Sequence, residues 1–232
     1  MALSAVDSRP LEPIPSVETA QQAARQIRQA IISGDFKPGD RLIERELVEQ
    51  LGVSRHPVRE ALRLLAREGF VDLHRNRGAL VSSVDASSVT EVYAIRKALG
   101  NLALDRLLTS GGSVPAADLK RLETLMERAD RCAKRKQHDA AIDADLDFQQ
   151  AVVDASGLTR VRRYFEESSD DVRRFNALLG IRYLDQETYV KRYIRALYEA
   201  IRAGDLQRAQ SVWHGKFEKA VERFVSAIDG KD

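Results

Sequence analysis

Apolar residues recur at helical spacing over about residues 17–33. Alanines and isoleucines return every three or four positions between Ala20 and Ile31, and the pattern stops at Gly34. This periodicity is typical of an amphipathic helix that buries one face. Residues 35–42, which contain Pro and Gly, predict a turn after this helix.

Two further helical patterns follow the turn. Residues 43–51 predict a short helix that ends at Gly52, and Ser54 is placed to cap a third helix that runs to about Glu68. Pro57 lies in the first turn of this third helix, where backbone N–H groups have no intrahelical partner in any case. The pattern therefore predicts two short helices joined by a glycine turn.

Residues 70–83 change from helical spacing to alternation. Two short runs of alternating apolar and polar residues are joined by Asn76, Arg77 and Gly78. A glycine at such a tip can adopt a positive φ, so the stretch predicts a β-hairpin.

From residue 85 onward the pattern is helical only. Glycine-containing breaks separate long stretches, and each stretch carries an apolar stripe that can face a shared core. The predicted helices span residues 86–109, 115–136, 139–155, 159–179, 186–203 and 206–228.

These elements predict a mainly α chain with two folded domains. Residues 17–84 form an N-terminal winged helix-turn-helix of three helices plus a β-hairpin, and residues 85–230 form an all-α antiparallel bundle. Residues 1–16 contain three prolines and no helical period, so we expect a flexible arm there.

Composition narrows the class of protein. The chain has 44% hydrophobic and 31% charged residues and a formal net charge of +2, as in an ordinary globular protein. Its single cysteine cannot form an internal disulfide, and its four histidines are scattered without zinc spacing. The sequence has neither a membrane-spanning apolar run nor a signal-peptide pattern, so we expect a cytoplasmic protein without a membrane partner.

Residues 21–84 carry a modest excess of basic over acidic residues, which is concentrated in seven arginines and favours a nucleic-acid partner. The planar guanidinium group matches guanine edges and phosphates, and apolar residues on the other side of the third helix can pack it onto the first two helices. An ordinary solvated helix face is the alternative, but a turn, a capped helix and a basic hairpin converge on this one surface. The arginines are Arg45, Arg55, Arg59, Arg63, Arg67, Arg75 and Arg77.

About residues 20–83 resemble the winged-helix domain of the GntR family of bacterial transcription regulators. The resemblance rests on G-x-x-x-P-G-x-x-L from Gly34, E-x-x-L from Glu44, and GVSR-x-PVREAL-x-x-L-x-x-EG from Gly52. It implies that double-stranded DNA is a partner. It also implies which residues touch DNA: Arg45, Ser54, Arg55, His56 and Arg59 on the helices, and Arg77 and Gly78 in the adjacent minor groove.

The implied contacts differ in kind. We expect Arg55 and Arg59 to read base edges, and Arg45 and Ser54 to contact phosphate or base. For His56 a surface position without a role in binding remains an alternative.

Residues 86–228 resemble the C-terminal ligand domain of the FadR subgroup, in its FCD variety. The carriers are VYAIRKALGNLALDRL, DADLDFQQAVVDASG and ALYEAIRAGDLQRAQSVW. The resemblance implies that this domain forms a homodimer and binds a small-molecule effector. In many relatives the core holds a divalent metal through an Asp and a His one helical turn apart and two later histidines, and the metal helps to hold a small carboxylate.

The metal ligands do not carry over to this sequence. Asp145 fits the aspartate, but Gln149, Ile194 and Lys216 stand at the three histidine positions. His214 lies two residues from Lys216, about 200° around a helix, and should face elsewhere. We therefore expect no metal and no other cofactor.

Two roles remain open for the residues at these positions. Lys216 either pairs with Asp145 as a closed ion pair or contacts an anionic effector, with Arg96 as a second cation. Gly100 also replaces a glutamate that is common in the family, and His138 is expected in a loop. The candidates for the effector pocket are Arg96, Asp145, Gln149, Ile194 and Lys216.

The sequence thus predicts a bacterial transcription regulator, a repressor that binds an inverted-repeat operator as a homodimer and responds to a small acidic metabolite. The alternative is a constitutive regulator whose helical domain only dimerises and binds no effector. No nucleophile–base arrangement and no glycine-rich phosphate loop occurs, so we do not expect an enzyme.

Overall fold

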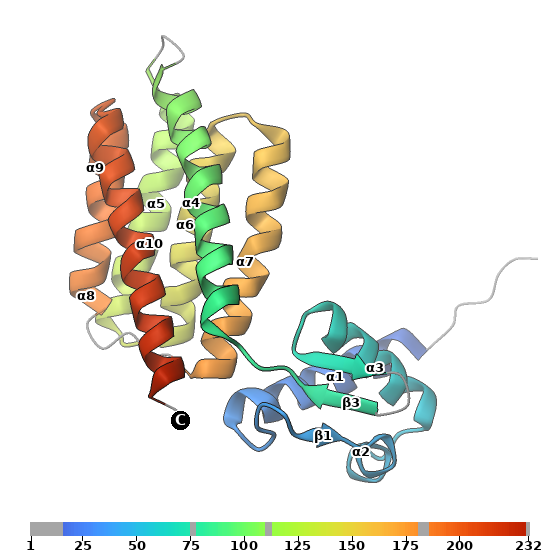
Figure 1. Ribbon diagram of the computed structural model, residues 1–232. Helices are drawn as coiled ribbons and strands as arrows, with labels where there is room; N and C mark the ends of the chain where they lie inside the picture. The colour runs from blue at the N-terminus through green and yellow to red at the C-terminus, as the bar shows by residue number, and fades with distance from the viewer. Residues whose placement is uncertain (1–15, 75–77, 110–112, 181–185, 231–232) are drawn as a thin grey trace, which may run out of the picture. The chain divides into compact units, whose positions relative to one another are not determined.

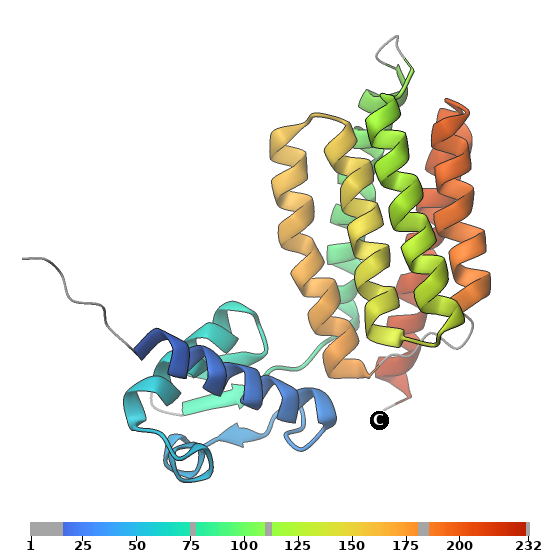
Figure 2. The ribbon, with the colours of Figure 1, turned by 180° about the vertical axis from the view of Figure 1, so that it is seen from behind.

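The computed structural model describes residues 16–74, 78–109, 113–180 and 186–230. Two compact units meet in the chain between Ser82 and Ser83, two residues before the boundary expected from the sequence. Both units are shown in Figure 1 and, from behind, in Figure 2. The arm expected over residues 1–16 lies almost wholly outside the described residues, and Ser16 is the first residue of a helix.

The first unit contains three helices and a small sheet. The bounds are α1 Ser16–Ser33, β1 Arg41–Leu42, α2 Glu44–Leu51, α3 Arg55–Arg67, β2 Val71–His74 and β3 Gly78–Val81. Gly52 ends α2 in the left-handed conformation with φ 63°, and its N–H donates to the Val48 carbonyl. This conformation suits glycine, which has no Cβ, and produces the tight turn between α2 and α3.

The apolar side of α3 is fully buried. Val58, Ala61 and Leu65 are each 0% exposed, and the buried alanines and Ile27 of α1 belong to the same core. Ser54 has the extended backbone of a helix N-cap, but its hydroxyl accepts no hydrogen bond from α3. The expected side-chain cap is therefore wrong, although the helix begins where it was predicted.

The sheet has one more strand than the sequence predicts. The order is β1-β3-β2 and both pairings are antiparallel, with Arg41 opposite Leu80 and His74 opposite Gly78. The first strand falls inside the stretch predicted as a turn. It is only two residues long, which is too short for an alternating pattern to mark it in the sequence.

The second unit is an all-helical bundle. Its elements are α4 Ala86–Thr109, α5 Ala116–Lys134, α6 His138–Ala155, α7 Thr159–Leu179, α8 Gln186–Tyr189, the π-helix η1 Val190–Arg195, α9 Ala196–Arg202 and α10 Leu206–Asp229. Helices α4 and α10 pack side by side, and α5, α6 and α7 form another side of the bundle (Figures 1 and 2).

Two details of the bundle differ from expectation. His138 is the first residue of α6 and not part of a loop. The helix expected over residues 186–203 is divided by η1. The division was not predicted, because a π-helical insertion keeps the apolar spacing nearly intact and leaves no break signal in the sequence. In the described part of the chain, no helix is both long and apolar enough to cross a membrane.

A close contact between α4 and α10 depends on Gly100. The fully buried Trp213 indole lies directly over this residue, and an added Cβ would overlap three of the ring atoms. The indole also packs on Phe217, with ring centroids 4.8 Å apart. Gly100 is therefore the small residue that lets this bulky side chain reach the core.

We expect Gly100→Ala to lower the free energy of unfolding by about 1–3 kcal/mol, because overpacking outweighs the gain in helix propensity. Thermal and urea unfolding of the full chain measure the effect. Gly215→Ala in α10 is the matched control, since an added Cβ there meets only Tyr193 at 3.9 Å. Equal unfolding midpoints for the two variants would contradict the close contact.

Candidate functional site

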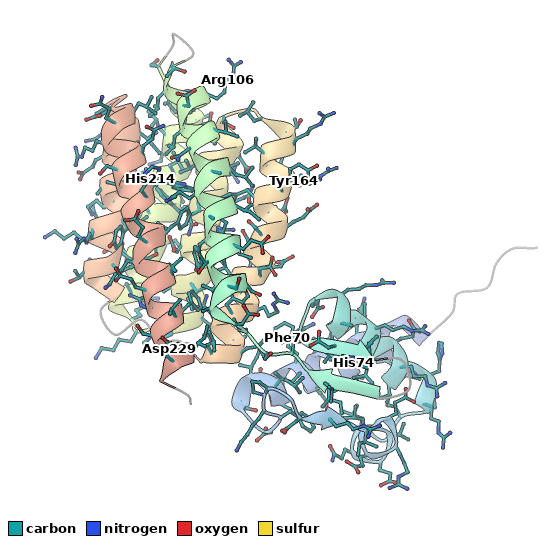
Figure 3. The ribbon with its side chains drawn as sticks, in the orientation of Figure 1. Phe70, His74, Arg106, Tyr164, His214 and Asp229 are labelled. Atoms are coloured by element: carbon teal, nitrogen blue, oxygen red, sulfur yellow. The ribbon has the colours of Figure 1, made fainter. Side chains whose placement is uncertain are left out.

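One side of α3 carries the residues expected to contact DNA. Ser54, Arg55, His56 and Arg59 are exposed, and so is Arg45 on α2. The burial of the opposite side of α3 fixes the direction in which these side chains project. The side chains of this unit are drawn in Figure 3.

The arginines of this surface differ in their partners. The Arg59 Nε donates to the Glu44 Oε2 at 2.8 Å, an ion pair that joins α3 to α2. Within the described ranges, Arg45 and Arg55 have no hydrogen-bond or ion-pair partner, so their guanidinium groups are free to take one. Glu44 was not expected at this surface, because it lies on a separate helix and no spacing in the sequence links it to Arg59.

The hairpin adds a second part to this candidate surface. Gly78 is exposed, begins β3 and has a φ of 81°, as expected for a residue at the tip. The exposed Arg41 lies beside it, since a Cβ added at Gly78 would be 3.7 Å from the Arg41 Nε. Arg77 lies outside the described residues. Arg41 is a basic residue that sequence analysis missed because β1 was not predicted.

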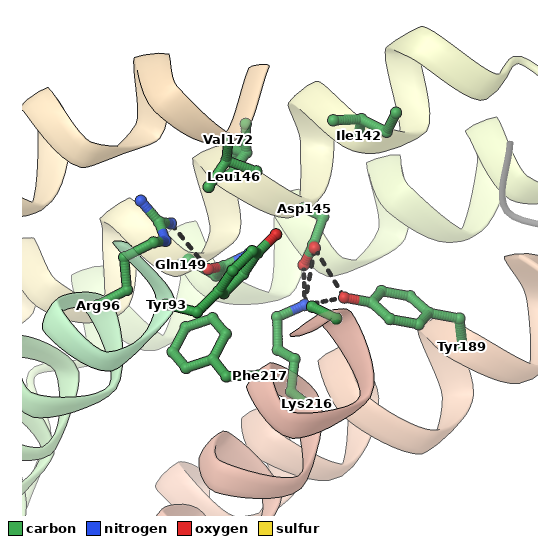
Figure 4. A pocket seen from close by; sticks show the side chains of 11 residues that line it. Tyr93, Arg96, Ile142, Asp145, Leu146, Gln149, Val172, Tyr189, Lys216 and Phe217 are labelled. Atoms are coloured by element: carbon green, nitrogen blue, oxygen red, sulfur yellow. Dashed lines mark hydrogen bonds and ion pairs between the residues drawn. The ribbon is translucent and has the colours of Figure 1, made fainter. Parts of the chain in front are cut away.

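A second candidate site lies inside the helical unit, where Lys216 meets Asp145. Lys216 is 2% exposed, and its Nζ donates to both Asp145 oxygens at 2.6 and 2.7 Å. The same Nζ donates to the Tyr189 hydroxyl at 2.6 Å, and this hydroxyl donates to Asp145 Oδ2 at 3.1 Å (Figure 4). All three N–H groups of the ammonium are thus satisfied by α6 and α8.

Burial changes the acid–base properties of Lys216. Loss of water lowers its pKa, and the neighbouring Asp145 carboxylate opposes this effect by stabilising the charged form. The structure thus contains the ion pair that was one of the two roles considered for these residues. Tyr189 was missed by sequence analysis, because its position just before η1 carries no recognisable pattern.

Arg96 is a buried cation without a carboxylate partner. It is 0% exposed, its Nη1 donates to the Ser168 and Ser169 hydroxyls at 2.9 Å, and its Nη2 donates to the Gln149 Oε1 at 2.9 Å. Its guanidinium lies 4.0 Å from the Phe165 ring centroid. Burial lowers its pKa to about 10, so it remains charged at neutral pH.

The buried charges do not balance. Of the buried residues that the structure describes, Arg96 and Lys216 carry two positive charges and Asp145 carries one negative charge. One positive charge is therefore left over in the core of the helical unit. An uncompensated buried charge is costly, so this region is attractive for an anion.

A small cavity lies beside these groups. It is lined by Tyr93, Arg96, Asp145, Gln149, Tyr189 and Lys216 together with apolar side chains, and several of these are shown in Figure 4. The free space is about 10 Å³, which is room for about one water molecule.

Two sequence candidates do not belong to this cavity. Ile194, proposed as a pocket residue, is not part of the lining and is buried in the apolar core, where its side chain follows the register of η1. His214 shares a hydrogen bond with Asn101 through its Nε2. It therefore connects α10 to α4 rather than to Asp145.

The donor set does not fit a divalent metal. The Lys216 ammonium takes up both oxygens of Asp145, the Gln149 oxygen accepts from Arg96, and Ile194 offers no donor. Over the residues that the structure describes, no cluster of three or more His, Cys, Asp or Glu side chains could hold a metal ion.

Comparison with known sequences identifies both units. The pattern described as "Bacterial regulatory proteins, gntR family" matches residues 19–81, and the FCD domain pattern matches residues 91–218. An uncharacterised HTH-type transcriptional regulator, YdhC of Bacillus subtilis, is 27% identical over 91% of this chain and 93% of its own length. The gluconate operon transcriptional repressor of Bacillus subtilis is 26% identical over 78% of this chain and 72% of its own.

A solved structure supports the same assignment. A transcriptional regulator of the GntR type from Rhodococcus sp. RHA1 has a TM-score of 0.69 and 25% sequence identity, covering 91% of this chain and 99% of its own. These relatives and both families are regulators and not enzymes. The chain therefore belongs to the GntR family of bacterial transcription regulators, with a DNA-binding domain followed by an FCD effector-binding domain.

Proposed function

We propose that the chain is a repressor that binds an inverted-repeat operator as a homodimer and responds to a small anion. The observation that carries the DNA-binding part is the orientation of α3, with one side fully buried and two arginines of its first turns exposed. One of the similar proteins is named as a repressor, which supports the same mode of action here.

Each candidate contact has a defined role in this proposal. Arg55 and Arg59 enter the major groove and donate to guanine edges, while Arg45 and the uncommitted Ser54 hydroxyl contact a phosphate or a base. His56 lies beside them on the exposed side of α3. Arg77 and Gly78 at the hairpin tip enter the adjacent minor groove, and Arg41 adds a cation next to Gly78.

Dimerisation increases the sequence specificity of this DNA recognition. One recognition helix covers only a few base pairs, and two helices related by a two-fold axis read both halves of an inverted repeat. Of the described elements, α4 offers a suitable surface for pairing. Ile95 and Leu102 are 45% and 56% exposed, and the exposed Ala98 lies between them at helical spacing.

The outer side of α4 is self-complementary. Glu91 and Arg106 lie at the two ends of the apolar stripe formed by Ile95, Ala98 and Leu102. Two antiparallel copies centred near Ala98 place Ile95 opposite Leu102 and Glu91 opposite Arg106. Apolar residues then meet in the middle and opposite charges at the ends, as a two-fold interface requires.

The buried charges favour one class of effector for the helical unit. The excess positive charge beside Arg96 and Lys216 favours a ligand with a single negative charge. Because the cavity holds only about one water molecule, a larger anion must displace side chains such as Gln149 or Tyr189. An anion that binds one dimer geometry more tightly than another shifts operator affinity.

The small size of the cavity also supports a second candidate function. All three donors of Lys216 are satisfied within the protein, as in a closed structural ion pair. In this alternative the helical unit only dimerises, and operator binding does not respond to metabolites.

We expect Arg55→Ala and Arg59→Ala to weaken binding to the specific operator by about 1–3 kcal/mol each, and binding to random duplex by much less. Electrophoretic mobility shifts with an operator selected from a random duplex library measure both affinities. Arg25→Ala, which removes an exposed charge from α1, is the control. If the Arg55→Ala/Arg59→Ala double variant retains sequence-specific binding, the proposed base-reading role of these two arginines is refuted.

Substitution Leu102→Glu should convert the dimer to a monomer, because it places a charge in the apolar stripe of the proposed interface, opposite Ile95 of the second copy. Light scattering after size-exclusion chromatography measures the mass. Tyr164→Glu is the control, since Tyr164 is a large side chain, 47% exposed on α7, outside the α4 surface (Figure 3). The proposed surface is wrong if the two variants have the same oligomeric state.

Small anions that bind the cavity should raise the thermal unfolding midpoint of the protein. At a concentration one hundred times the dissociation constant, the free energy of unfolding increases by about 2.7 kcal/mol. Formate, acetate, lactate, succinate and citrate at equal ionic strength compare single with multiple charges, each with and without EDTA. We expect stabilisation by monoanions that EDTA leaves unchanged. If no anion alters either the unfolding midpoint or the operator affinity, the constitutive alternative is favoured. If EDTA abolishes the shift in midpoint, the expectation that the site holds no metal is wrong.

A further inference from the structure

Glu44 is an acidic residue at the surface proposed to face DNA. It is the first residue of α2, and its carboxylate accepts a hydrogen bond from the Arg59 Nε at 2.8 Å. A carboxylate close to DNA phosphates lowers affinity by electrostatic repulsion. Because Glu44 lowers the affinity for DNA, its position beside a candidate base-reading arginine indicates a function that offsets this loss.

The geometry of the pair suggests what that role is. Glu44 occupies the Nε, on the side of the guanidinium nearest the chain, and within the described residues Arg59 has no other hydrogen-bond partner. The two terminal nitrogens, Nη1 and Nη2, remain available. A guanidinium presents donors in a fixed planar fork, so holding one donor also orients the others.

We propose that Glu44 is a positioning residue that orients the Arg59 guanidinium for recognition of a guanine and that increases specificity at the expense of affinity. This inference rests on the proposed DNA-binding function and adds a residue outside the set expected to touch DNA. Arg59 makes the contact with the base, and Glu44 acts through Arg59. A guanine presents two acceptors, O6 and N7, which match two donors of a correctly oriented arginine.

The pair has little effect on the stability of the free protein. The side chains of Arg59 and Glu44 are 57% and 40% exposed, and ion pairs in such exposed positions contribute little in water. Docking in a groove removes water from the pair and strengthens the interaction. The consequence therefore appears in DNA recognition and not in unfolding.

A purely local role for Glu44 is the competing explanation. An acidic residue in the first turn of a helix stabilises that helix through its dipole. Glu46 lies in the same first turn, is exposed, and has no ion-pair partner among the described residues. It has the same charge and lies in the same helix turn without the contact to Arg59, so it provides a matched control.

The experiment compares Glu44→Gln with Glu46→Gln in the full chain. The probes are the operator selected by the wild-type protein from a random duplex library, the complete set of its single-base-pair variants, and a random duplex. Both substitutions remove one negative charge and should raise affinity for random duplex about twofold to threefold. Only Glu44→Gln should lower the ratio of specific to random binding beyond this shared effect, by about twofold to tenfold, with the loss confined to one G·C pair in each half-site.

Two further variants separate positioning from other effects. Glu44→Asp keeps the charge and should recover part of the discrimination at that base pair. In an Arg59→Ala background, Glu44→Gln should no longer change discrimination, because the group that it orients is absent. Thermal unfolding of Glu44→Gln and Glu46→Gln should agree.

The outcomes distinguish this inference from the function on which it rests. If the wild-type protein selects no preferred duplex, the proposed operator binding fails. If the wild-type protein discriminates but Glu44→Gln and Glu46→Gln have equal specificity ratios, operator binding stands and the positioning role of Glu44 is refuted. An equal loss of discrimination at all base pairs would also refute it, since that result indicates general damage to the surface.

Discussion

The burial of one side of α3 is the constraint on which the DNA-binding surface depends. Val58, Ala61 and Leu65 have no exposed area, so α3 cannot rotate without removing them from the core. This fixed rotation determines that Arg55 and Arg59 face solvent. The turn at Gly52 then brings the start of α2 close enough for Glu44 to reach Arg59. Apolar packing thus sets the orientation of polar groups that have little influence on the fold.

The helical unit follows a different principle, because charged groups lie within its core. Lys216 is enclosed by Asp145 and Tyr189, whereas Arg96 is solvated by two serine hydroxyls, an amide oxygen and an aromatic ring. The first arrangement is neutral as a pair and the second retains its charge. At a position where the resemblance led us to look for a metal-ligating histidine, this chain has the Lys216 ammonium, paired with Asp145. The positive charge of the site is therefore encoded in the sequence rather than acquired from solution.

The fold was largely predictable from sequence because long amphipathic helices leave a strong periodic signal. Helices α4 and α7 have the predicted bounds, and α1 and α10 differ by one residue at one end. Strand β1 was missed because two residues are too few to show an alternating pattern. The π-helix η1 was missed because one extra residue in a turn barely disturbs the helical periodicity. The family was predicted correctly from local motifs.

The candidate sites were only partly predictable, because their contacts join separate elements. Glu44 and Tyr189 each reach a partner on another helix, and no spacing in the sequence reports such a contact. Ile194 was placed by its position in a motif, but the local register of η1 turns it into the core. Sequence position thus identified the helices of the site more reliably than the direction of individual side chains.

Trp213 has a consequence for how this protein can be studied. It is the single tryptophan of the chain, is fully buried, and contacts Phe217, which lines the cavity beside Lys216. Its indole N–H has no hydrogen-bond partner in the described core. Indole emission depends on the polarity around the ring, so any rearrangement that admits water or an anion next to Phe217 changes the fluorescence of one known residue. The protein carries an intrinsic fluorescent reporter in the core of its helical unit, so entry of a ligand into the cavity can be followed without an attached dye.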